Sequence, residues 1–529
     1  MRTPCDEAAV RSRGAEDPCG AHARIWVLLA TILGSSMALI DGTVVNVALP
    51  AVQASFHASV VDVQWVIESY GLFLGALILV GGSLGDLFGR RLIFVLGIAI
   101  FTVASAVCGS AVSIHQLIIA RSIQGVGAAL LVPGSLAIIS VSFDEQARGR
   151  AIGTWSGFTA ITTAIGPVVG GWLVEHGSWR WVFFINLPLA IAVIAISLWH
   201  IPESRIAIAG RIDWSGALLA TVGLGGLVAG FMQSVNLGFR NPLVFGSLIL
   251  GIACLIALVF VEGKVTSPML PLALFESHTF TGANLLTLFL YAAIGILFFL
   301  FPLNLIQVQG YSATAAGAAV LPMILLMFFL ARWSGGLVAR RGPRIPLITG
   351  PLVAACGFAL FAVPSMGESY WKTFFPAIIV LGFGASVTVA PLTTVVLNSI
   401  DQDRVGSASG INNAVARIAG VLAIAIFGIV MVKAFVSQLN HSLAHLSLSP
   451  VVRQELHANE TKLAGLRAPL GLDSSTSNAI EQSVREAFVF GFRIAMLGCV
   501  ALSLASAAVA WLTIRKDSGH VSLAMVGPA

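Results

Sequence analysis

Residues 82–91 read GSLGDLFGRR and join two long apolar segments of the chain. A loop this short between membrane helices must turn sharply, and glycine permits the backbone conformations that such a turn needs. Arginine side chains do not easily cross a lipid bilayer, so two of them hold the turn on the cytoplasmic side. The stretch therefore predicts a tight cytoplasmic turn between two membrane-spanning helices. Its glycines, acid and bases are Gly82, Gly85, Gly89, Asp86, Arg90 and Arg91.

The composition is that of an integral membrane protein. Of the 529 residues, 57% are hydrophobic and 10% are charged, and the mean hydropathy is +0.93. No soluble globular domain has such a composition. The net charge of +5 comes from bases in short loops, where they act as a topology signal. We therefore expect a lipid bilayer around the chain and no nucleic-acid partner.

The cysteines and the N-terminal segment exclude several alternatives. The six cysteines are scattered singly with no metal-ligand or redox spacing, so we expect packing residues, no metal and no cofactor. Residues 1–24 lack the short apolar core of a cleaved signal peptide, and the apolar run that follows is long enough to span a membrane. The first span is therefore expected to be retained. The cysteines are Cys5, Cys19, Cys108, Cys254, Cys356 and Cys499.

Apolar windows of about 20 residues, the length that crosses a bilayer, predict an all-α membrane protein with about fourteen helices. A bacterial-type inner (plasma) membrane is expected, with both termini in the cytoplasm, because the bases of short loops gather on one side. The predicted helices are 25–49, 61–85, 91–111, 114–140, 150–173, 181–200, 213–234, 242–262, 280–307, 314–338, 344–364, 373–399, 405–434 and 487–514. The inside bases are Arg90, Arg91, Arg148, Arg150, Arg205, Arg211, Lys264, Arg340, Arg341, Arg344, Arg404, Arg515 and Lys516, and the outside bases are Arg180, Arg240 and Lys372.

A second copy of the turn indicates two related halves. Residues 336–344 read GLVARRGPR, and they keep the leucine, glycine and arginine positions of the first turn while Ala339 replaces the acid. Two six-helix bundles around a midplane site are the transporter plan that such a repeat implies. The predicted division is a cytoplasmic tail 1–24, a bundle 25–200, a linker 201–278 with two extra helices, a bundle 279–514 and a cytoplasmic tail 515–529.

One long polar insert, 437–484, lies between the last two predicted helices and faces outside by the same topology. It has no cysteine and no aromatic residue, and it carries mixed charge. Too little apolar surface is available for it to fold alone, so we expect a small surface cap or a flexible loop more than a ligand-binding domain.

Several motifs resemble those of the major facilitator superfamily of transporters. The turn 82–91 is similar to the family's loop after helix two, in which the acid caps a neighbouring helix and pairs with a base as a cytoplasmic latch. Residues 117–129 are similar to the helix-four motif, whose arginine, here Arg121, is usually linked with proton coupling. Helix five resembles the antiporter motif, with Thr162 where the pattern has an earlier glycine. The antiporter residues are Gly166, Pro167, Gly170 and Gly171.

Helix one narrows the resemblance to the fourteen-spanner drug:proton antiporters. Residues 38–50, ALIDGTVVNVALP, resemble the helix-one motif of that family, which twelve-spanner relatives usually lack. The stretches 65–70, 178–181 and 408–413 fit the same family. The resemblance covers about residues 25–435 and the final helix.

Charged residues inside the apolar spans are the candidates for proton coupling, because an ionisable group in hydrocarbon is costly and is usually kept for a task. Counted along their helices, Asp41, Glu68 and Arg121 all fall in the outer half of the membrane. Asp41 facing Arg121 would stay ionised, whereas Asp41 near Glu68 would hold a proton more readily. The alternatives are a static Asp41–Arg121 ion pair and, for Glu68, a solvated cavity wall.

A candidate substrate cavity is formed by Asn46, Gln124, Asn412, Asn413 and Arg417. Arg417 lies close to the midplane with no acid near it in its own half, so it is a candidate for binding an anionic group. Bonds to backbone carbonyls and a pair with Asp41 across the halves are the alternatives. The two asparagines of helix thirteen would line the cavity or join helices by hydrogen bonds.

The sequence thus predicts a secondary active transporter that exports small amphipathic molecules in exchange for protons, as a monomer driven by the proton gradient. An uptake symporter of the same superfamily is the first alternative, opposed by the helix-five motif and the extra helices. An intramembrane enzyme is disfavoured, because no zinc-binding, phosphate-binding or nucleophile motif is present. The sequence leaves open which substrate is transported, whether sodium replaces protons, and whether a periplasmic adaptor takes part.

Overall fold

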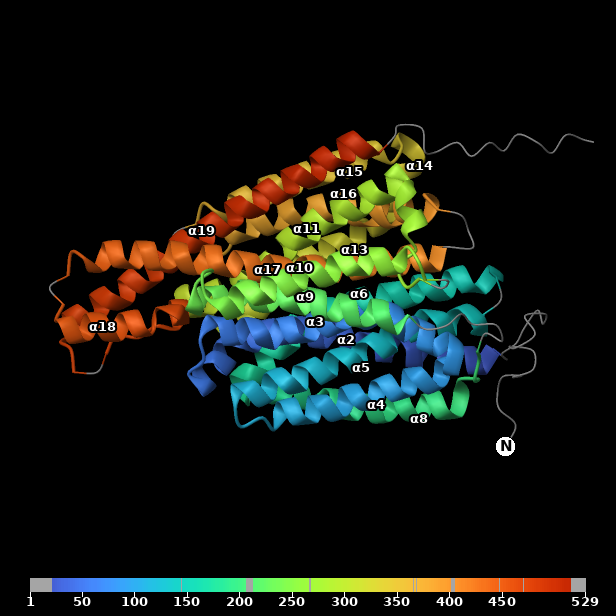
Figure 1. The fold of residues 1–529 in the computed structure, drawn as a ribbon, viewed down its shortest axis with the longest axis horizontal. Helices are drawn as coiled ribbons and strands as arrows, with labels where there is room; N and C mark the ends of the chain where they lie inside the picture. Colours follow the sequence, from blue (N-terminus) through green and yellow to red (C-terminus); the bar gives the residue numbers. More distant parts are fainter. Residues whose placement is uncertain are drawn as a thin grey trace, which may run out of the picture. The chain divides into compact units, whose positions relative to one another are not determined.

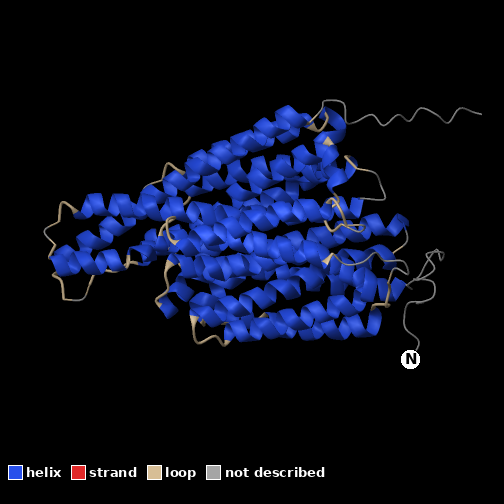
Figure 2. Cartoon of the chain, viewed as in Figure 1, coloured by secondary structure: helices blue, strands red, loops and turns tan. Residues whose placement is uncertain are grey.

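The structure is a computed structural model that describes residues 21–143, 145–205, 213–265, 268–364, 366–367, 369–400, 405–446, 448–469 and 471–514. All regular secondary structure in these residues is helical (Figure 2). Most of the two predicted tails, 1–20 and 515–529, lies outside the described residues, as do the predicted inside bases Arg211, Arg404, Arg515 and Lys516.

Fourteen helical segments in the described part of the chain are long and apolar enough to cross a membrane, so the predicted fold class is confirmed (Figure 1). The first eight spans are α2 (Ala21–Phe56), α3 (Val60–Phe88), α4 (Arg90–Gly109), α5 (Ile114–Ser142), α6 (Glu145–His176), α7 (Trp181–Phe184) with α8 (Asn186–His200), α9 (Trp214–Leu237) and α10 (Pro242–Glu262). The other six are α11 (His278–Leu303) with the π turn η2 (Asn304–Val308), α12 (Ala313–Ala318) with α13 (Leu321–Gly335), α15 (Arg344–Phe361), α16 (Phe374–Asn398), α17 (Val405–Leu443) and α19 (Ser474–Thr513).

Local signals explain where several of these helices begin and end. The Ser59 hydroxyl accepts from the Asp62 N–H and the Asp62 carboxylate accepts from the Ser59 N–H, a reciprocal cap that starts α3. At the other end of α3, Gly89 has φ +121°, a conformation that a side chain would strain. Gly342 has φ +73° at the matching place in the second copy of the turn, after the short helix α14 (Leu337–Arg341). The two copies therefore share a glycine turn.

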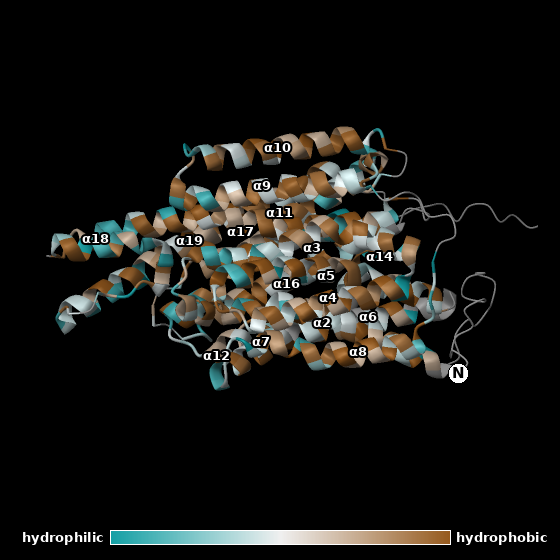
Figure 3. Cartoon of the chain, turned by 60° about the horizontal axis from the view of Figure 1, so that its bottom comes forward, coloured by the Kyte–Doolittle hydropathy of each residue, from teal (hydrophilic) through white to brown (hydrophobic). Residues whose placement is uncertain are grey.

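Three predicted spans are interrupted. The sixth divides at Ile185 into α7 and α8, the ninth ends in the π turn η2, and the tenth divides into α12, α13 and α14. The insert 437–484 is also more helical than a loop, because α17 continues to Leu443 and α19 begins at Ser474. Between them lie α18 (Pro450–Ala458), which is mostly hydrophilic in Figure 3, and the 3₁₀ helix η4 (Glu460–Gly465).

Backbone contacts divide the chain into two compact units. Unit 1 comprises Met1–Met269, Phe298–Leu321 and Ile424–Phe492, and unit 2 comprises Leu270–Leu297, Pro322–Ala423 and Arg493–Ala529. This division differs from the predicted one, because unit 1 also takes in one end of α11, α17 and α19. The reason is direct packing: the Gln64 amide of α3 donates to the Ile424 carbonyl, and α12 packs on α6.

Small residues permit the closest helix contacts in each unit. In unit 1, a Cβ on Gly81 of α3 would collide with the Ala129 carbonyl of α5, and one on Gly127 would lie 2.8 Å from the Phe101 Cα of α4. The extra pair belongs to this unit, since α9 packs on α3 and α10 on α9. In unit 2, a Cβ on Gly295 of α11 would come within 2.9 Å of the Gly420 Cα of α17.

Candidate functional site

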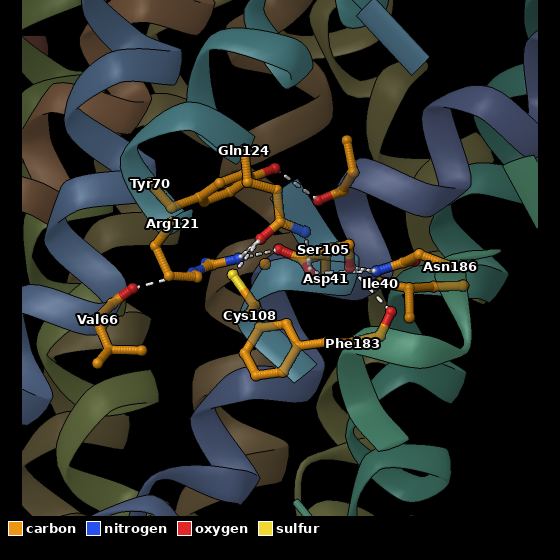
Figure 4. A network of polar contacts seen from close by, with 12 residues as sticks. Ile40, Asp41, Val66, Tyr70, Ser105, Cys108, Arg121, Gln124, Phe183 and Asn186 are labelled. Carbon is orange, nitrogen blue, oxygen red and sulfur yellow. Dashed lines mark hydrogen bonds and ion pairs between the residues drawn. The ribbon is translucent and has the colours of Figure 1, made fainter. Parts of the chain in front are cut away.

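The centre of unit 1 holds a carboxylate with three donors around it (Figure 4). Asp41 projects from α2 and is fully buried. Its Oδ2 is paired with Arg121 Nη1 of α5, and its Oδ1 accepts from Gln124 Nε2 at 2.8 Å and from Asn186 Nδ2 of α8 at 3.4 Å. Three different helices therefore meet at one side chain. Both carboxylate oxygens of Asp41 therefore have hydrogen-bond donors.

Arg121 is equally enclosed, with 1% of its side chain exposed. Its Nε donates to the Val66 carbonyl of α3 at 3.0 Å, and its Nη1 also donates to Gln124 Oε1 at 2.8 Å. The guanidinium carbon lies 4.2 Å from the centre of the Tyr70 ring, a cation–π contact. Two of the bonds of Arg121 thus go to neutral acceptors and do not depend on the charge of Asp41.

The network also includes residues that sequence analysis did not propose for the site (Figure 4). Asn186 donates to Ser105 Oγ at 3.0 Å, and Ser105 donates to the Phe183 carbonyl at 2.8 Å. The Cys108 thiol lies 3.6 Å from Gln124 Oε1. The signal for Asn186 was a lone amide in an apolar run, since such groups in lipid need partners.

The geometry determines what this network can do. Burying an ion pair costs several kcal/mol per ion in desolvation, which only close contacts and further hydrogen bonds offset. Asp41 and Arg121 have both. A proton that enters the site would neutralise Asp41 and remove its attraction to Arg121, while Val66 and Gln124 would still hold the guanidinium. The guanidinium of Arg121 thus has neutral acceptors besides the carboxylate of Asp41.

Glu68 of α3 is as buried as Asp41 but is not part of the network. Both of its carboxylate oxygens are buried without a hydrogen-bond partner among the described residues. A charged carboxylate in that position would lack any compensation, whereas a protonated carboxyl carries no net charge. Glu68 and Asp41 are thus equally buried but differ in their hydrogen-bond partners.

The residues predicted to line a substrate cavity have other contacts. Gln124 is part of the Asp41 network, and the Asn46 amide donates to the Gly42 carbonyl of its own helix at 3.1 Å. In unit 2, the Asn412 amide of α17 donates to Thr287 Oγ1 of α11 at 2.7 Å and to Asn284 Oδ1 at 3.2 Å. Asn412 thus joins two helices. Asn413 donates to the Ser409 carbonyl at 3.0 Å and is exposed. Arg417 is half-buried and interacts electrostatically with Tyr291 of α11.

The helix-five motif lies where α6 touches two other helices. A Cβ on Gly166 would collide with Thr43 Oγ1 of α2, and one on Gly170 would collide with Val44. A Cβ on Gly171 would collide with the Ala313 carbonyl of α12, and Gly317 of α12 in turn touches the carbonyl of Pro167. The Thr162 hydroxyl, at the position where the pattern has glycine, donates to Ser36 Oγ at 3.0 Å. The motif allows close backbone approach on both faces of α6.

The turn after α3 is held by a residue that the sequence did not point to. Asp86 Oδ1 accepts from Arg90 Nε at 2.9 Å and lies 2.8 Å from Arg90 Nη2, and among the described residues no other partner of its carboxylate is seen. The carboxylate at the start of α4 is Glu203, which accepts from the Arg91 and Leu92 N–H groups at 3.1 Å each. A carboxylate at a helix N-terminus is favoured by the helix dipole and satisfies unpaired N–H groups. Glu203 thus caps the start of α4, and the helix cap by Asp86 stays a prediction.

Comparisons with known proteins agree with this fold. Residues 31–424 match the Major Facilitator Superfamily model. A tetracenomycin C resistance and export protein of Streptomyces glaucescens is 32% identical over 508 residues, which are 94% of this chain and 93% of that protein. The multidrug resistance protein Stp of Mycobacterium tuberculosis is 31% identical over 505 residues, 93% of each chain.

Among solved structures, a bacterial homologue of the human lysosomal transporter Spinster, in an inward-facing and unoccupied conformation, is similar in fold. The TM-score is 0.65 at 19% identity, with 93% of this chain and 97% of that chain covered. The likeness concerns the arrangement of helices alone. Together with the family match over most of the chain, the fourteen apolar helices and the motifs of helices one, four and five, it leads to one assignment: the chain is a multi-pass membrane transporter of the Major Facilitator Superfamily.

Proposed function

We propose that the chain exports small amphipathic compounds, drugs or antibiotics among them, in exchange for protons. The observation that carries the proposal is the fully buried Asp41–Arg121 pair with its further donors Gln124 and Asn186. An ionisable pair in the membrane interior is costly, and sites of this kind mark proton relays and substrate pathways. The relatives named above, a resistance and export protein and a multidrug resistance protein, support the export direction.

Asp41 is the proposed carrier of the exchanged proton. In the structure the Asp41 carboxylate is paired with Arg121. A proton that binds Asp41 forms the neutral acid, and Arg121 then keeps its bonds to the Val66 carbonyl and Gln124. Release of that proton to the other side restores the pair. A change in the protonation of Asp41 on α2 therefore changes the contacts that Arg121 makes with α3 and α5, the helices that carry its other acceptors.

The rest of the proposal concerns the setting. The turn after α3 faces the cytoplasm of a bacterial-type cell, both termini are cytoplasmic, and the insert between α17 and α19 faces outside. The chain works as a monomer without a cofactor, driven by the proton gradient, with the substrate, protons and the bilayer as its partners. Glu68 contributes to the recognition of cationic substrates.

Everted membrane vesicles test the proposal directly. Respiration acidifies the lumen of such vesicles, and a fluorescent weak base reports the pH difference. A screen for drug susceptibility in a pump-deleted host first identifies the compound against which the chain protects most. Addition of that compound should collapse part of the pH difference in vesicles with the parent chain and not in vesicles with Asp41→Asn. Accumulation of the compound in the lumen without proton efflux would contradict the exchange mechanism.

A further inference from the structure

A cavity of about 930 Å³ lies at the far end of α2, away from the Asp41 network. Its walls come from the last two turns of α2, the π turn η2, and the segment that contains α18, η4 and the residues after η4. Gln53 in its wall is twelve residues beyond Asp41, about 18 Å along the helix axis. The proposed proton exchange does not use this cavity. All of its lining residues belong to unit 1.

One buried side chain fixes three walls of the cavity. Gln53 is 6% exposed, and its Nε2 donates to the Lys462 carbonyl of η4 at 3.1 Å. Its Oε1 accepts from Gln307 Nε2 of the π turn at 2.8 Å. A Cβ on Gly465 would lie 3.3 Å from the Gln53 side chain. The insert is thus tied to α2 and to η2 by polar bonds, so the cavity is preformed.

Backbone strain gathers at the same place. In the part of the chain that the structure describes, His57 and Leu463 are the non-glycine residues with positive φ, each at +51°. His57 lines the cavity, and Leu463 follows Lys462 in its wall. Histidine adopts positive φ more readily than most residues, but leucine rarely does, and strain like that at Leu463 clusters at ligand clamps and functional sites. It is a second observation, independent of the cavity, that points to a site.

The charge of the wall selects the ligand. Three bases, Lys462, Arg467 and Arg485, line the cavity against one acid, Glu455, which leaves 3 − 1 = +2 with histidine neutral. Arg485 also lies 3.7 Å from Glu481, so the other two bases carry most of the positive potential. Arginine and lysine are the donors that bind carboxylate and sulfonate groups. The cavity therefore favours an anion.

Apolar side chains complete the wall. Leu456 of α18 and Leu466 after η4 are buried yet line the cavity, together with Ile306 and Val308 of the π turn. A volume of this size holds a molecule the size of a drug, and apolar walls with a few placed polar groups are typical of small-molecule sites. We propose that this cavity is a second binding site of the chain, which takes a small amphipathic organic anion with its acidic group on Lys462 and Arg467.

The test is direct binding to the purified full-length chain in phosphatidylcholine nanodiscs, which carry no net lipid charge. Three probes of matched size are titrated by calorimetry: 1-naphthoate, neutral 1-naphthamide and cationic 1-naphthylmethylammonium. We expect naphthoate to bind at least about tenfold more tightly than either of the others, because only its charge-assisted bonds add to the apolar contact. Equal binding of all three probes would overturn the proposal.

Variants locate the site. The double variant Lys462→Gln with Arg467→Gln should weaken naphthoate binding by about tenfold or more, and Glu455→Gln should strengthen it. Arg453→Gln is the matched control, because Arg453 is an exposed base of α18 outside the cavity wall. Unchanged affinity in the double variant, or an equal loss in the control, contradicts the assignment. Asp41→Asn should bind naphthoate like the parent, so failure of the proposed export mechanism can be told from failure of this site.

Discussion

Two aspartate–arginine pairs of this chain use the same side chains in opposite surroundings. Asp41 and Arg121 are 0% and 1% exposed, and two further side chains donate to Asp41. Asp86 lies in the last turn of α3 and Arg90 begins α4 beyond Gly89, and their side chains are 37% and 12% exposed. Exposed pairs contribute about 0.2–1 kcal/mol, whereas removing one partner of a buried pair costs about 3–5 kcal/mol. The comparison shows that surroundings, more than residue type, decide how much the chain depends on each pair.

Glu68 sharpens the comparison, because it shares the burial of Asp41 but not its partners. The side-chain oxygens of Glu68 have no donor among the described residues. An acid therefore joins the charge network through its hydrogen-bond partners and not through burial alone. We expect the largest effect from removal of the Asp41 charge and a smaller one from removal of its donor Gln124. Substitution of Glu68 should have less effect again, and substitution of Asp86 the least.

The largest effect is expected from Asp41→Asn. The amide keeps the shape of the carboxyl but cannot titrate, and Arg121 loses its counter-charge. Proton-driven export should fall to background while downhill substrate exchange continues in part. Proton-driven export is measured as resistance in a pump-deleted host. Downhill exchange is measured with labelled compound in proteoliposomes at equal pH on both sides. Full resistance in this variant would show that export does not depend on the charge of Asp41.

Removing a donor should have the next largest effect. Gln124→Leu deletes a 2.8 Å bond to Asp41 and a 2.8 Å bond from Arg121, each worth about 1.5–3 kcal/mol because a charged group takes part. We expect at least about a tenfold loss of export rate at normal membrane expression. Asn186→Ala loses a longer bond to Asp41, 3.4 Å, and a bond to the neutral Ser105, 3.0 Å, and should cost less. The reverse order would show that Asn186, and not Gln124, orients the carboxylate.

Glu68→Gln should be milder. No hydrogen bond is lost, because neither side-chain oxygen of Glu68 has a partner among the described residues. Export of uncharged compounds should stay within about twofold of the parent, a range typical of substitutions that remove no contact. Resistance to cationic compounds should fall more than resistance to uncharged ones in a paired susceptibility panel. An equal loss across both groups would place Glu68 in the coupling step.

The smallest effect is expected at the exposed pair. Asp86→Asn removes about 0.2–1 kcal/mol, the usual contribution of an exposed pair, so transport and inner-face cysteine accessibility should change little. Glu203→Gln should have the larger effect at the same turn, because Glu203 holds two N–H groups of α4 and lies 3.7 Å from Arg91. Comparison of the two variants tells whether the turn depends on the predicted acid or on the one that the fold brings to it.

Much of the architecture could be predicted because a bilayer imposes simple rules. Apolar length and the distribution of bases give the number of spans, and depth along a helix placed Asp41 and Arg121 at one level. The tight turn after α3 could also be predicted from its glycines, and Gly89 there has positive φ. These features depend on local sequence and on one solvent boundary.

The partners of the charged pair could not be predicted in the same way. Asn186 and Cys108 are single polar residues in apolar helices, and their positions in the sequence do not say which neighbour they face. Glu203 follows the end of α8 and reaches α4 only because the chain folds back there. The helical extension of α17 into the insert was hidden by its polar residues, which read as loop. Each of these depends on contacts between segments far apart in the sequence.

Proton release on substrate addition tests the central claim most directly. The purified carrier in detergent, at low buffer strength with a pH indicator, receives the compound that the susceptibility screen identifies. The account predicts a proton signal from the parent, from Glu68→Gln and from Asp86→Asn, and none from Asp41→Asn. A full signal from Asp41→Asn, together with its loss in Glu68→Gln, would contradict the account and assign the exchanged proton to Glu68.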